Sequence, residues 1–277
     1  MVKHTFTEYN DATQALRIKD LKQSLYDDGE VIMDKVLVCL HGDEHKKRRK
    51  LENKIFTRDI FQKYENVIFP KTINETLDPY KATGEMDLVD FGFRVLLNLT
   101  ADFSGIDRPL KSKKETETLL RLLKIFASGA TLHHSTRDHD EVKGEVRAAL
   151  KEFDRDFLTP SIERRKLIIS QNSNEDLPND ILTVLLVNDD QLNMPYDVLQ
   201  REIAFYLLAG AQTSIHSLVH AFHEIHTWLE NNPSRKDDIT NDPIFVQKCF
   251  LESTRLHPSS PVALRKPVCP VQLPGNK

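Results

Sequence analysis

The stretch LLAGAQTSIHSL, Leu207 to Leu218, decides how this chain folds. It lies within a segment from Pro195 to Asn231 whose apolar residues first occur on all sides and later thin to helical spacing. This pattern predicts one long helix through the middle of a large fold. A glycine inside such a helix costs about 1 kcal/mol relative to alanine. Some compensating feature is therefore expected at Gly210.

Two explanations for Gly210 follow from its neighbours. Thr213 can donate a hydrogen bond to the carbonyl of Ala209, four residues back, which loosens the helix and opens a notch for a flat ligand. Alternatively, Gly210 only allows another helix to pack closely, and the hydroxyl of Thr213 has its hydrogen-bond partner within the helix and no further role. Taken alone, these residues favour the packing explanation.

The rest of the chain also has mainly helical spacing of apolar residues, broken by short polar or proline-bearing joints, so we predict a mainly α fold. No linker stands out, and residues 1–277 are expected to form a single domain. The segment Lys3 to Tyr9 alternates and predicts a strand, and the proline-rich tail after Pro258 predicts extended chain. Further helices are expected at Asp11 to Ile18, Gly42 to about Phe56, Asp59 to Tyr80, Asp87 to Phe103, Lys113 to Ala127, Asp138 to Phe157, Asn179 to Val187 and Pro243 to Leu256.

The composition excludes several classes of function. With 39% hydrophobic and 29% charged residues and a formal charge of −4, the chain resembles ordinary globular proteins and has no general attraction to nucleic acid or anionic membranes. Cys39, Cys249 and Cys269 are widely separated, which favours free thiols in a reducing compartment. No secretory or membrane-spanning segment is evident, so we expect a cytoplasmic protein.

A second segment, FLESTRLHPSSPVALRKP, runs from Phe250 to Pro267. Glu252 and Arg255 lie three residues apart and share a helix face, where they can form an ion pair. An ion pair exposed to solvent would contribute little to the stability of the fold. Because apolar residues flank the pair and Pro258 enforces a helix stop, we expect it to be buried near the core.

A third segment, LVCLHGDEHKKRRKLENKIF, runs from Leu37 to Phe56 and, alone, reads as a solvated basic helix face. In their order and separations, the three segments together resemble the cytochromes P450, the haem-thiolate monooxygenases, of soluble bacterial type. The stretch LLAGAQTS resembles their central oxygen-binding helix, and ESTRLHPSSPVALR resembles their ExxR helix. The resemblance runs from Thr5 to Lys277 and implies a P450-like helical fold with a minor β component.

The resemblance implies roles for residues of the central helix. Ala209 and Gly210 are expected over the distal face of haem b (iron protoporphyrin IX), with the glycine making room above the cofactor. Thr213 is expected to help deliver protons. Gln212 stands where the family has an acid, and an amide can hydrogen-bond but cannot ionise.

The resemblance also implies a basic end of the cofactor site. His45 and Arg49 correspond to the histidine and arginine that contact haem propionates, and Arg265 to the arginine that grips one of them with its planar donor fork. Glu252 and Arg255 are expected to be structural.

The family's iron ligand is a cysteine in a glycine-bearing FxxGxxxCxG loop downstream of the ExxR helix. This sequence contains no such loop, and neither Cys269 nor the other two cysteines stand in that context. The expectation is a partial domain, incomplete at its C-terminus and slightly at its N-terminus, which lacks the thiolate ligand and is inactive by itself.

By resemblance, the parent activity is insertion of one oxygen atom from dioxygen into an apolar organic substrate, with electrons from a ferredoxin or a flavoprotein reductase. Two alternatives remain open: a non-catalytic helical binding module that keeps the scaffold, and a plain helical interaction protein. A polar helix face is favoured over a metal site for the histidines that recur on the central helix, which are His216, His220, His223 and His226.

Overall fold

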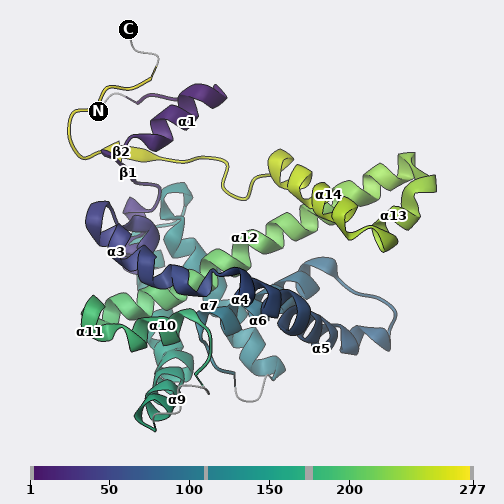
Figure 1. Ribbon diagram of the computed structural model, residues 1–277, viewed down its shortest axis with the longest axis horizontal. Coiled ribbons are helices and arrows are strands. Elements are labelled where there is room, and N and C mark those ends of the chain that lie inside the picture. The colour runs from purple at the N-terminus through teal and green to yellow at the C-terminus, as the bar shows by residue number, and fades with distance from the viewer. Residues whose placement is uncertain (1–2, 109–111, 172–176, 275–277) are drawn as a thin grey trace.

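The structure, a computed structural model, describes residues 3–108, 112–171 and 177–274. The mainly α prediction is confirmed: helices surround α12 (Tyr196–Asn231), a 36-residue helix that crosses the molecule (Figure 1). The remaining α-helices are α1 (Tyr9–Arg17), α2 (Glu30–Met33), α3 (Gly42–Glu52), α4 (Arg58–Lys63), α5 (Phe69–Lys81), α6 (Leu88–Ser104), α7 (Lys113–Ala130), α8 (His139–Phe153), α9 (Thr159–Ser170), α10 (Ile181–Val187), α11 (Asp189–Leu192), α13 (Lys236–Asn241) and α14 (Pro243–Leu256).

Local capping explains why several helices begin where the sequence predicts. The side chain of Asp87 accepts a hydrogen bond from the backbone of Asp90 at the start of α6, and Asp138 does the same for α8. Ser112 and Glu115 form a reciprocal capping box at the start of α7. Each cap satisfies backbone N–H groups that have no partner within the helix.

Two predicted helices contain a π-helical turn directly before a proline. The turn Tyr64–Ile68 joins α4 to α5 ahead of Pro70, and Asp154–Leu158 joins α8 to α9 ahead of Pro160. Such a turn shifts the backbone pairing where proline supplies no N–H group. The helix expected to end at Phe157 therefore continues to Ser170.

The minor β component is a two-stranded antiparallel sheet, β1 (Leu21–Gln23) with β2 (Arg265–Pro267), in which Gln23 pairs with Arg265. The extended conformation predicted for the tail is confirmed at β2. The predicted strand from Lys3 to Tyr9 is wrong, because these residues pair with no strand in the described chain and α1 begins at Tyr9.

The main core surrounds the first half of α12, which packs along α6 and contacts α7. Ile203, Leu207 and Ala211 are fully buried there or nearly so. The second half of α12 extends away from this body and carries α13 and α14 (Figure 1). Phe222 packs edge-to-face on Phe250 in this arm. No helix in the described ranges is long and apolar enough to cross a membrane.

Candidate functional site

The hydrogen bond predicted on the central helix is present. Thr213 Oγ1 donates to the carbonyl oxygen of Ala209 at 2.6 Å, and the Thr213 side chain lies at an exposed point of α12. The carbonyl is shared between this hydroxyl and the helix ladder. A hydroxyl and a carbonyl are therefore available together on the helix surface.

Gly210 has a packing role of its own on the side of α12 that faces α6. A β-carbon at this position would lie 2.5 Å from Cγ2 and 3.0 Å from Oγ1 of Thr100 on α6. Real β-carbons do not approach other atoms so closely, so the missing side chain makes room for α6. Of the two explanations for this glycine, close helix packing is the one that the geometry favours.

Gln212 joins a neighbour on the same helix face. Its Nε2 lies 3.1 Å from Nε2 of His216, while its Oε1 is buried without a hydrogen-bond partner in the described chain. An unpaired buried oxygen is unfavourable unless water or a ligand supplies a donor. The amide therefore holds one unused acceptor beside Thr213.

The expected basic end consists of a histidine and two arginines, and the two arginines have no acidic partner in the described chain. His45 is half-buried, and burial first, then the positive charges of Arg49, His41 and Arg48, lowers its pKa. The Arg49 guanidinium lies 5.4 Å from the ring centre of Phe56, and Arg265 Nη1 donates only to the carbonyl of Leu264 at 3.0 Å. In the described chain no carboxylate lies within ion-pair distance of Arg49 or Arg265.

No hydrogen bond in the described residues links His45, Arg49 and Arg265 to one another. The strand that carries Arg265 nevertheless lies near α3, because β1 contacts the turn Leu37–Cys39 that leads into that helix (Figure 1). This arrangement fits a ligand with carboxylates at one edge, since uncompensated guanidinium groups bind carboxylates well.

Glu252 and Arg255 form the predicted ion pair, with Arg255 Nη2 2.7 Å from Glu252 Oε1. The expectation of burial is wrong, because the side chains are 57% and 67% exposed. Both residues lie on a face of α14 that points away from α12, its main packing partner. The hydrogen bonds of the pair lower the pKa of Glu252 and raise that of Arg255.

The three cysteines are free and none is an activated thiolate. Burial raises the pKa of Cys39 to about 12 and also raises that of Cys249. Desolvation and the carboxylate of Asp20 raise the pKa of Cys269. Without a bound metal, these thiols are therefore protonated at neutral pH.

The histidines of α12 do not form a metal centre within the described ranges, where no group of three or more metal-binding side chains occurs. His220 instead stacks on His257 with ring centres 4.6 Å apart, and His257 Nε2 lies 2.7 Å from Glu224 Oε1. These contacts tie the end of α14 to α12.

Sequence reasoning missed a buried polar cluster between α3 and α12, made of Arg48, Glu52, Glu202 and Tyr206. The only available signal was the pairing of Arg48 and Glu52 four residues apart on one helix. Glu202 stands in an otherwise apolar part of α12, and no local pattern indicates which distant side chain meets it.

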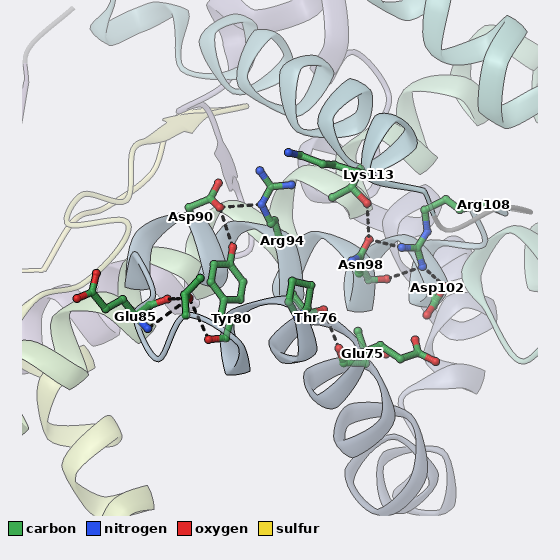
Figure 2. A pocket seen from close by; sticks show the side chains of 14 residues that line it. Glu75, Thr76, Tyr80, Glu85, Asp90, Arg94, Asn98, Asp102, Arg108 and Lys113 are labelled. Atoms are coloured by element: carbon green, nitrogen blue, oxygen red, sulfur yellow. Dashed lines mark hydrogen bonds and ion pairs between the residues drawn. The ribbon is translucent and has the colours of Figure 1, made fainter.

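A groove of about 680 Å³ lies between α5 and α6 and near the start of α7, and Figure 2 shows its polar lining. Its charged groups largely pair with one another. Arg94 Nε donates to Asp90 at 2.8 Å, and Tyr80 donates to the same carboxylate at 3.0 Å. Arg108 binds Asn98 and Asp102. Because these partners satisfy one another, we assign no ligand to the groove.

Comparison with solved structures identifies the fold. The chain matches epothilone B-bound cytochrome P450epoK with a TM-score of 0.66 and 18% identity over 90% of this chain and 61% of that one. It matches retinoic acid-bound cyanobacterial CYP120A1 with a TM-score of 0.66 and 16% identity, over 96% of this chain and 62% of that one. It matches full-length CYP116B46 from Tepidiphilus thermophilus with a TM-score of 0.72 and 17% identity, over 97% of this chain and 35% of that one.

These similarities show that the chain has the cytochrome P450 fold, and that it spans about 60% of the length of most such structures. The fold expected from the sequence is confirmed. No family model and no curated protein matches the chain.

Proposed function

We propose that this chain is the haem-binding part of a P450-type monooxygenase. The observation that carries the proposal is the P450 fold with the Thr213–Ala209 hydrogen bond at an exposed point of its central helix. When bound, haem b supplies the chemistry of dioxygen activation. The proposal includes an apolar organic substrate, an electron donor such as a ferredoxin or a flavoprotein reductase, and a cytoplasmic location.

Each side chain of the proposed site has a definite task. Arg49 and Arg265 bind the carboxylates at the cofactor edge, because these cations lack acidic partners in the described chain, and the imidazole of His45 adds a hydrogen-bond donor. Thr213 holds a proton at Oγ1 beside the Ala209 carbonyl. Gln212 supplies hydrogen bonds without ionising, and in this proposal an ordered water would take the place of the acidic side chain in proton delivery.

Haem titration of the 277-residue chain tests this proposal, with absorbance in the Soret region as the readout. We expect saturable binding, and a carbon monoxide complex without the thiolate-type shift, because none of the three cysteines stands in a glycine-bearing FxxGxxxCxG stretch. Arg49→Gln should weaken haem binding several-fold, corresponding to loss of about 1 kcal/mol or more from a charge-assisted hydrogen bond. Lys50→Gln removes the same charge from the next residue and should leave affinity nearly unchanged. Absence of saturable binding would refute the proposal.

A second candidate is a non-catalytic binding module that retains the scaffold. It is favoured by Gln212, an amide that cannot ionise and that stands where the family has an acid. Because this chain is expected to be inactive by itself, the test uses a longer chain that includes a cysteine-ligand loop and is loaded with haem. Product formation from a hydrocarbon probe with a chemical reductant would support the monooxygenase. Saturable probe binding without product would support the module.

A further inference from the structure

The buried polar cluster joins the two helices that carry the proposed site. Arg48 Nη2 donates to Glu202, and Arg48 Nε donates to Glu52 at 3.4 Å. The hydroxyl of Tyr206 donates to the other oxygen of Glu52. The backbone N–H of Leu37 donates to both oxygens of Glu202, at 3.2 and 2.9 Å. Both carboxyl groups are fully buried.

The charges of this cluster do not balance. A single guanidinium, that of Arg48, faces two carboxyl groups, so the ionised pair would leave a net negative charge away from water. Like charges at short distance and low local dielectric disfavour that state strongly. Tyr206 donates a hydrogen bond but no positive charge, so a proton kept on Glu52 or Glu202 is the remaining way to balance the cluster.

The other charged groups near the cluster form no ion pair with its carboxyl groups in the described chain. The positive charge of Arg49 lowers the pKa of Glu52, but its guanidinium lies against Phe56. Arg201 lies 3.8 Å from Asp34 and 2.9 Å from Asp197. The Cys39 thiol stays neutral because its pKa is raised. Helices α10 and α2 also pack here: the segment Ile181–Val187 carries no charge, Lys54 binds Asn188, and Glu30 of α2 pairs with Lys143.

The cluster controls the position of the segment before α3. Besides the Leu37 N–H bonded to Glu202, the carbonyl of Lys35 accepts a hydrogen bond from Arg48 Nη1 at 2.5 Å. Lys35 has a φ of +59°, a left-handed conformation that a lysine adopts only when its surroundings hold it. The chain continues from this turn into α3.

We propose that Glu52 and Glu202 form a proton-binding site and that one shared proton holds segment 34–52 against α12. Loss of this proton loosens the contact between segment 34–52 and α12, which we call the seam. Segment 34–52 contains His45 and Arg49, so the same event weakens their hold on haem. That last consequence alone rests on the proposed function.

The direction of the pH dependence follows from burial. Burial and the charge of Glu52 raise the pKa of Glu202 to about 8, and burial raises that of Glu52. The folded chain therefore keeps a proton that the unfolded chain releases near its ordinary pKa of about 4.3. The stabilisation is complete below the unfolded pKa of about 4.3 and is lost progressively as the pH rises from there through the folded pKa.

Hydrogen-exchange mass spectrometry tests the seam without haem. Protection factors, corrected for intrinsic exchange, should fall about tenfold or more for peptides within 34–52 between pH 6 and 9, since one pKa unit corresponds to a tenfold change. Peptides from α7 and α8 should keep constant protection. Unchanged protection of 34–52 in the wild-type chain would overturn the proposal, whatever any variant does.

Variants provide the matched comparison. Glu202→Gln cannot ionise and should remove the pH dependence at 34–52, whereas Glu252→Gln, on an exposed pair, should retain it. If both variants keep the wild-type profile, Glu202 is not the titrating group and the assignment is wrong. Haem titration at the same two pH values then shows whether the seam affects the cofactor. A chain that never binds haem refutes the proposed function but leaves the exchange result standing.

Discussion

The α-carbon of Gly210 on α12 faces the side chain of Thr100 on α6, and a β-carbon there would lie 2.5 Å from Thr100 Cγ2. Thr100 is held in place because Oγ1 donates to the Leu96 carbonyl at 2.7 Å. The absence of a β-carbon at Gly210 thus lets α6 and α12 approach closely at this point.

Gly210→Ala should therefore destabilise the chain, although alanine is the better helix former. The clash outweighs the gain of about 1 kcal/mol in helix propensity, and we expect a net loss of about 1–3 kcal/mol from overpacking. Urea unfolding followed by circular dichroism measures the loss. In a Thr100→Ala background the nearest atom is the Thr100 β-carbon at 3.4 Å, so there the same substitution should be neutral or stabilising. An equal loss in both backgrounds would rule out this contact as the cause.

Arg165→Gln should be strongly destabilising. The guanidinium is buried, and its Nη2 lies 2.6 Å from Asp180 while Nη1 lies 3.0 Å from Asp107. Removing it leaves the buried carboxyl of Asp180 without its cation, which typically costs about 3–5 kcal/mol. The midpoint of chemical unfolding is the measurement.

Arg255→Gln provides the contrasting case on an exposed pair. The partner Glu252 remains solvated when the guanidinium is removed, so the unfolding midpoint should not change measurably. A large loss would mean that this pair is covered in solution and would restore the expectation of burial.

The Cys39 thiol should react slowly with alkylating reagents. Burial, followed by the charge of Asp27, raises its pKa to about 12, so at pH 8 its thiolate fraction is about a thousandfold below that of an ordinary cysteine. Iodoacetamide labelling with mass spectrometry should show a Cys39 rate that still rises between pH 8 and 10. A plateau within this range would show that the pKa is not raised.

Local chemistry decided much of what could be predicted. The helix starts at Asp87 and Asp138 follow from side-chain caps, and the Thr213–Ala209 bond follows from a spacing of four residues on a helix. These interactions involve residues a few positions apart, so the sequence pattern contains both partners.

The sequence by itself determined the mainly helical architecture, the central helix from Tyr196 to Asn231 and the extended conformation at Arg265. Three features depend on how the helices pack: Thr100 occupies the space beside Gly210, Glu252 is exposed, and Glu202 meets Arg48 across 154 positions. The physical reason is that burial and charge pairing depend on which helix faces which. Helical periodicity gives the apolar face of each helix but does not identify its neighbour.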